Sequence, residues 1–210
     1  MLVPIPETSL RWTHAVALLL LTGACSSPAS TPGRLAVTER QAGSLHGTDV
    51  SGVIHRPALR GTTTDGRPFD LRSAPDVTAV FFGYTRCPDV CPTTMADLAS
   101  AARRLAPRLR ARVHVVFVTQ DLPHDTAAVL RRWLDRFDHT FIGVRPPSVA
   151  SDTEVLTALK APATDLPPVG SARAVEHTGS VYVFAADRVV VYTGGTTPSQ
   201  YAEDLTALAS

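Results

Sequence analysis

Two uninterrupted apolar runs stand out along the chain, at residues 77–84 (VTAVFFGY) and 113–119 (VHVVFVT). Runs of this length without polar alternation are typical of strands that are covered on both faces in an α/β sheet. Between them, residues 93–106 carry apolar side chains at helical spacing, and Pro107 marks the expected end of that helix. The pattern therefore predicts a strand–helix–strand unit.

Shorter patterns predict the remaining elements. They are a β-hairpin over 61–71, helices over 125–137 and 152–159, a second hairpin over 181–184 and 189–192, and a last helix over 198–208. Asp125 and Thr126 are expected to supply N-cap chemistry for the helix that follows them. The order is typical of a thioredoxin-like α/β fold, with an N-terminal β-hairpin and a central mixed sheet flanked by helices. Ligand and redox sites of open α/β sheets usually lie at the carboxyl ends of strands.

The first 24 residues have the plan of a secretory signal peptide. A weakly basic start precedes the apolar run 15–21, and Gly23 and Ala24 are small residues directly before Cys25. The run is shorter than the roughly 20 apolar residues that span a bilayer. A cysteine at this place resembles the lipobox of bacterial lipoproteins, which implies a lipid on Cys25 and a location on the outer face of the cytoplasmic membrane. The alternative is an ordinary cleaved signal with an incidental cysteine.

The mature part is expected to contain a tether and one domain. Residues 25–46 include the Ser/Pro-rich stretch SSPASTPG and are predicted to be a flexible tether, and residues 47–210 a single domain. The chain is 44% hydrophobic and 19% charged, which excludes wholesale disorder. Its net charge is +1, and no basic patch with interleaved aromatic residues indicates a nucleic-acid partner.

Candidate chemistry lies directly after the first apolar run, in the segment Cys87-Pro-Asp-Val-Cys91. Pro88 suits the first position of a helix, which would place Cys87 at the helix cap, where a thiolate is favoured. In a helical turn the two cysteines are four residues apart and share a face. They could form a structural disulfide, a redox couple or a metal clamp. Two soft thiolates select Cu(I), zinc or an iron–sulfur cluster, and zinc would require further ligands.

Three segments resemble the Sco (SenC) family of copper-handling, thioredoxin-like proteins. They are FGYTRCPDVCPTTMADL, VFVTQDLPHDTAAVLRRWLDRFDHTFIG and EHTGSVYVF. The resemblance implies that Cys87, Cys91 and His177 bind copper, as Cu(I) or Cu(II), and that Asp121 and Glu176 support the site. It also implies a metallochaperone rather than an enzyme, which delivers copper to the dinuclear copper site of cytochrome c oxidase subunit II.

The second segment departs from the family's pattern in the loop after the second apolar run. Its proline is shifted by one position, and His124 stands where the family usually has arginine. Besides His177, the chain has six histidines that are expected to be structural or solvated: His14, His46, His55, His114, His124 and His139.

A thiol–disulfide oxidoreductase is the main alternative function. It would use Cys87 as the attacking thiol and Cys91 as the resolving thiol. Three residues separate the two cysteines, whereas thioredoxins have two between theirs, and His177 occurs where a thioredoxin would have its cis-proline. A peroxiredoxin is not expected, because its P-x3-T-x2-C signature precedes neither cysteine.

Overall fold

The computed structural model describes residues 44–74, 76–161 and 179–210. Its strands are β1 (Thr48–Asp49), β2 (Arg60–Thr63), β3 (Pro68–Asp70), β4 (Val77–Gly83), β5 (Val113–Thr119), β6 (Ile142–Arg145), β7 (Val181–Ala185) and β8 (Arg188–Tyr192). Its helices are the 3-10 turn η1 (Leu71–Ser73), α1 (Val90–Arg104), α2 (Pro107–Arg110), α3 (Ala127–Leu134), α4 (Val149–Ala158) and α5 (Pro198–Ala209).

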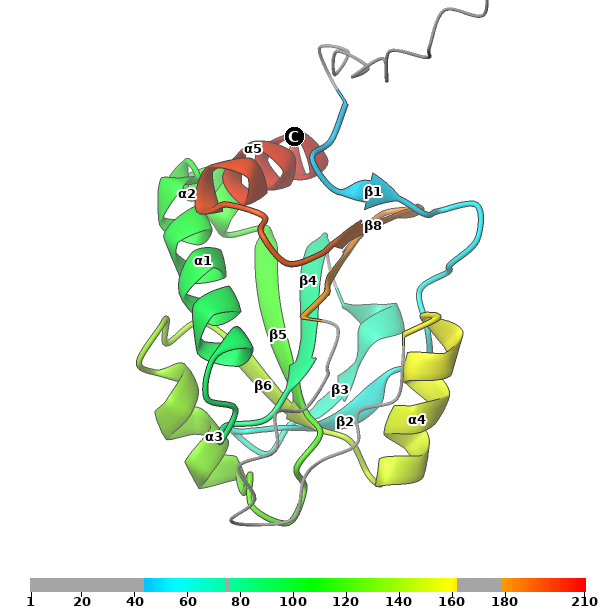
Figure 1. The fold of residues 1–210 in the computed structure, drawn as a ribbon, viewed down its shortest axis with the longest axis vertical. Helices are drawn as coiled ribbons and strands as arrows, with labels where there is room; N and C mark the ends of the chain where they lie inside the picture. The colour runs from blue at the N-terminus through cyan, green and yellow to red at the C-terminus, as the bar shows by residue number, and fades with distance from the viewer. Residues whose placement is uncertain (1–43, 75, 162–178) are drawn as a thin grey trace, which may run out of the picture. The chain divides into compact units, whose positions relative to one another are not determined.

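The strands form one mixed sheet in the order β1-β8-β7-β4-β5-β6-β2-β3 (Figure 1). Strands β4, β5 and β6 are parallel, whereas β7 runs antiparallel to β4 and β3 runs antiparallel to β2. The predicted α/β fold with an N-terminal hairpin and a central mixed sheet is therefore confirmed. Because β4, β5 and β6 are parallel, the loops at their carboxyl ends lie at one edge of the sheet.

Apolar side chains fill both faces of the sheet, which explains the uninterrupted runs. Phe81 and Phe117 point into a core that also receives buried residues of α1, α3 and α5. Val80 and Val118 point into a second core on the other face, which α4 covers. In the described part of the chain, no helix combines the length and the apolar character needed to cross a membrane.

Several boundaries differ from the sequence prediction. Helix α1 begins at Val90 instead of residue 93, α3 spans 127–134 instead of 125–137, and α4 begins at Val149 behind the N-cap Ser148. The short strands β1 and β6 were not predicted. Strand β6 contains Gly143, where an added Cβ would lie within 3 Å of side chains from β2's end and α3. Gly143 lets the side chains of Thr64 and Leu130 approach the backbone of β6 closely. Because glycine is uncommon in strands, it also makes β6 hard to recognise from the sequence.

Candidate metal centre

The two predicted sulfur ligands lie together between the end of β4 and the start of α1. The backbone N–H of Cys91 donates to Cys87 Sγ at 3.3 Å, and both residues are buried thiols. Cys87 is not the helix cap as predicted, because Asp89 holds that position. The sulfur of Cys87 instead accepts from an N–H of the first helical turn, where the helix dipole favours negative charge.

The Cys91 sulfur is enclosed by the sheet. An added Cβ on Gly83, the last residue of β4, would lie 2.7 Å from Cys91 Sγ, so only glycine leaves room for the thiol here. The hydrogen bond with Cys87 and burial together raise the pKa of the Cys91 thiol. Cys91 thus keeps its proton until a metal ion or a reaction partner displaces it.

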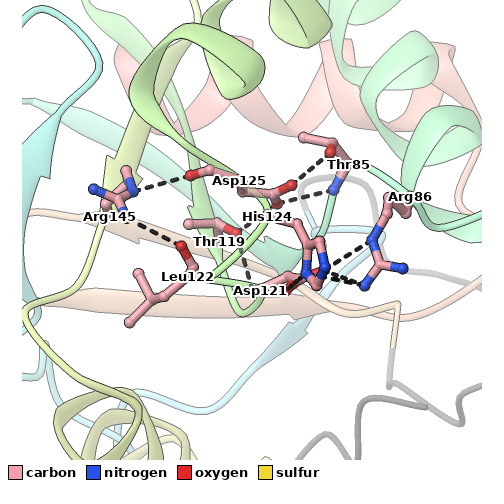
Figure 2. A network of polar contacts seen from close by, with 8 residues as sticks. All are labelled: Thr85, Arg86, Thr119, Asp121, Leu122, His124, Asp125 and Arg145. Atoms are coloured by element: carbon pink, nitrogen blue, oxygen red, sulfur yellow. Dashed lines mark hydrogen bonds and ion pairs between the residues drawn. The ribbon is translucent and has the colours of Figure 1, made fainter. Parts of the chain in front are cut away.

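A fully buried carboxylate, that of Asp125, fixes the segment before the cysteines. It accepts hydrogen bonds from the backbone N–H of Thr85 at 3.0 Å and from the Thr85 hydroxyl at 2.5 Å. It also accepts from the hydroxyl of Thr119, at the end of β5, at 2.6 Å (Figure 2). The prediction that Asp125 caps the next helix was wrong, since the N-cap is Thr126, whose side chain accepts from the helix. Asp125 holds the ends of β4 and β5 together.

A second buried carboxylate, Asp121, binds the residue directly before Cys87. Arg86 donates to Asp121 Oδ2 through Nη2 at 2.6 Å and through Nε at 3.1 Å. His124 Nδ1 lies 2.7 Å from Asp121 Oδ1. Burial alone would raise the pKa of Asp121, but the hydrogen bonds from His124 and Arg86 outweigh it and hold this pKa below its usual value. Asp121 is therefore a carboxylate at neutral pH.

The loop between these two aspartates is held from a third strand. Arg145, the last residue of β6, donates to the carbonyl of Asp125 at 2.9 Å and to that of Leu122 at 3.1 Å. Figure 2 shows these contacts beside those of the two carboxylates. The ends of β4, β5 and β6 thus contribute to one polar network next to the cysteines.

The described residues include only part of the predicted site. It brings Cys87 and Cys91 together and connects Asp121 to Arg86, whereas Cys25, Glu176 and His177 lie outside the described residues. Among the described residues, no three His, Cys, Asp or Glu side chains form a group that could hold a metal ion.

Sequence reasoning missed five members of the network. They are Thr85, Arg86, Thr119, Asp125 as a clamp, and Arg145. The available signal was their position, because each lies at the carboxyl end of a parallel strand or in the loop that follows it.

Comparison with known proteins places the chain in a family. The family model SCO1/SenC matches residues 59–210. The mitochondrial protein SCO2 of Saccharomyces cerevisiae is 30% identical over 139 residues, which cover 64% of this chain and 44% of the yeast protein. Protein SenC of Rhodobacter capsulatus is 30% identical over 149 residues, 66% of each chain. The matched segment thus spans less than two thirds of the length of the yeast relative.

Solved structures agree with the family match. The solution structure of apo Sco1 from Thermus thermophilus has a TM-score of 0.66 at 29% identity, covering 79% of this chain and 97% of the other. The structure of Bradyrhizobium japonicum ScoI with copper bound has a TM-score of 0.61 at 26% identity, covering 72% and 97%. With its cysteine loop at the carboxyl end of a thioredoxin-like sheet, the chain belongs to the SCO1/SenC family.

Proposed function

We propose that this protein is a copper metallochaperone whose domain binds one copper ion through Cys87, Cys91 and His177. Asp121 supports the site by holding the segment before Cys87, and Glu176 neighbours the imidazole ligand in the sequence. The acceptor in this proposal is the dinuclear copper site of cytochrome c oxidase subunit II, and its support is the chain's membership of the SCO1/SenC family.

The observation that carries the proposal is the contact between the two buried cysteines. The Cys91 amide lies 3.3 Å from Cys87 Sγ, and the two thiols share a hydrogen bond, so both sulfurs can reach one ion. Two thiolates are soft donors that suit Cu(I) and are poorly matched to Mg²⁺ or Ca²⁺. Copper replaces the thiol protons when it binds, so its affinity should fall as the pH falls.

Relatives support copper as the cargo. The Bradyrhizobium japonicum ScoI structure, 26% identical to this chain, was determined with copper bound. A low-coordinate site of two sulfurs and one imidazole leaves room for a donor from an acceptor protein, as transfer requires.

The proposal includes export and anchoring. Residues 1–24 would be removed as a signal peptide and Cys25 would carry the lipid. The tether would be shorter than the predicted 25–46, because Leu45 packs against the core and His46 is held by Asp204 of α5. The domain would then act at the outer face of the bacterial cytoplasmic membrane.

A second candidate function, thiol–disulfide exchange with a partner protein, has one specific observation in its favour. The hydrogen bond shared by the two thiols puts Cys91 within reach to resolve a mixed disulfide formed on Cys87. Reduction of an acceptor's cysteines and copper delivery would use the same pair of sulfurs.

His177→Ala separates the two functions. If His177 is a ligand, the variant should bind Cu(I) at least tenfold more weakly than the wild type in a competition titration with a chelator, whereas thiol–disulfide exchange should be unchanged. His139→Ala, at an exposed histidine, is the matched control and should bind copper as the wild type does. Unchanged copper affinity in His177→Ala would remove the imidazole from the site.

A further inference from the structure

The imidazole of His124 is held in one tautomer beside the cysteine loop. Its Nδ1 lies 2.7 Å from Oδ1 of the buried carboxylate Asp121. Arg86 Nη2, which can only donate, also faces Nδ1 but lies farther away, at 3.3 Å. The closer carboxylate oxygen decides the tautomer, because a deprotonated nitrogen would repel it, so Nδ1 carries a proton and donates it to Asp121. In the neutral ring the lone pair is then on Nε2, for which the described residues provide no hydrogen-bond donor.

The imidazole of His124 is accessible to solvent, and hydrogen bonds fix the backbone that carries it. The His124 side chain is 41% exposed, so an ion or a partner can reach it from solvent. Its backbone N–H donates to the Asp121 carbonyl at 3.1 Å, and its carbonyl accepts from Thr126 at 2.9 Å. Arg145 fixes the carbonyls on either side of His124, those of Leu122 and Asp125.

The position of His124 relates it to the cysteine loop. The Nη2 atom of Arg86, the residue before Cys87, lies 3.3 Å from His124 Nδ1, and Figure 2 shows the ring next to this guanidinium. The positive charge of Arg86 is matched by the carboxylate of Asp121 at 2.6 Å, so the cluster with a neutral imidazole has no net charge. A copper ion at Nε2 would therefore not meet an uncompensated cation.

No other described histidine combines these features. His46 also has Nδ1 against a buried carboxylate, that of Asp204, but its Nε2 lies 3.5 Å from Glu203. Among the described residues, the side chains of His55, His114 and His139 form no ion pair with a carboxylate. A carboxylate that holds the Nδ1–H of a histidine whose Nε2 is accessible is the usual arrangement behind metal-ligating histidines.

We infer that His124 Nε2 is an accessory copper ligand at the rim of the cysteine loop, which holds the ion briefly on its way into or out of the thiolate site. One imidazole binds copper weakly, and the remaining donors would be water or a ligand of the protein that supplies or accepts the ion. The inference rests on the proposed function, since it assigns a second, weaker binding site to the same copper ion.

The test isolates His124 from the main site. In the variant Cys87→Ser/Cys91→Ser/His177→Ala, Cu(I) is added anaerobically while the imidazole nitrogens are followed by NMR. We expect His124 to show the Nδ1–H tautomer without metal, and its Nε2 resonance to move on titration. The resonances of His139, the matched exposed histidine, should stay in place. Affinity should be at least 100-fold weaker than that of the wild type.

Two additional substitutions test the arrangement. His124→Asn should abolish the weak site, and Asp121→Asn should weaken it about tenfold, because the tautomer is no longer fixed. Copper that binds the triple variant without moving the His124 resonances would overturn the inference, and so would an unchanged affinity in Asp121→Asn. Failure of the proposed function is distinct, because it would appear as a wild-type protein that lacks the tight site, whatever His124 does.

Discussion

Two buried aspartates hold two distant regions of this fold, and they do so differently. Asp125 joins the ends of β4 and β5 beside the cysteine loop, through the hydroxyls of Thr85 and Thr119 and the backbone of Thr85. Asp204 of α5 fastens the N-terminal arm near β1, away from that loop in Figure 1. It accepts from the backbone and ring of His46, from the Gly47 backbone and from the Tyr192 hydroxyl.

The two aspartates differ in the solvent exposure of the side chains next to them. The hydrogen bonds to Asp204 come from His46, Gly47 and Tyr192, and the His46 side chain is only 17% exposed. Next to Asp125, the network continues through Asp121 to Arg86 and His124, whose side chains are 39% and 41% exposed. Similar buried carboxylates thus have two different roles in this fold. Asp204 only secures a chain segment, whereas Asp125 secures a segment that carries chemically useful groups at the surface.

Removing each carboxylate tests this comparison with the largest expected effect. Asp125→Ala and Asp204→Ala should each lower the free energy of unfolding by about 3 to 4 kcal/mol, because several buried donors lose a charged acceptor. Chemical denaturation measures both. Only Asp125→Ala should also weaken Cu(I) binding, by tenfold or more, because only Asp125 positions the cysteine loop. Equal copper affinities in the two variants would show that this clamp does not shape the site.

Asp152 differs from both, because this carboxyl is buried in α4 without the hydrogen-bond donors that Asp125 and Asp204 have. Its Oδ1 has no hydrogen-bond partner among the described residues, and Oδ2 accepts only from Gln120 at 3.3 Å. Burial raises the pKa of Asp152 from 3.8 to about 6, although the Gln120 contact lowers it. The folded state therefore binds this proton more tightly than the unfolded chain does.

It follows that ionised Asp152 lowers stability above pH 6, by about 3 kcal/mol at most, and that this cost disappears as the pH falls toward 4. Asp152→Asn should thus be more stable than the wild type at pH 7.5, by about 1 to 3 kcal/mol, and nearly equal to it at pH 4. Urea denaturation at the two pH values measures the difference. A variant that is less stable than the wild type at pH 7.5 would mean that the carboxylate has a stabilising partner.

Sequence patterns predicted the elements whose local sequence has a strong hydrophobic pattern. Strands β4 and β5 were expected because both of their faces are buried, and the β7–β8 hairpin was found close to its predicted bounds. Strand β6 was missed because it has four residues, one of them Gly143. The pairing partner that makes it a strand, β5, is distant in sequence.

The site was predictable where neighbouring residues act together and not where distant residues do. Cys87 and Cys91 are four positions apart on a helical turn, so their contact could be expected. An aspartate just before a helix can either cap that helix or bind a distant loop, and the sequence around Asp125 does not distinguish the two roles. Its partner Thr85 is 40 residues away in the sequence. Only the folded sheet decides between those two roles, and the ring orientation of His124 depends on the same packing.

Cu(I) titration of the purified protein with a competing chelator tests the central claim most directly, with Cys87→Ser, Cys91→Ser and Asp204→Ala measured alongside. We expect one tightly bound ion in the wild type and in Asp204→Ala. Each cysteine variant should lose at least 100-fold in affinity, since one soft ligand of a low-coordinate site is gone. Wild-type affinity in either cysteine variant would contradict a copper site built on the pair of thiols.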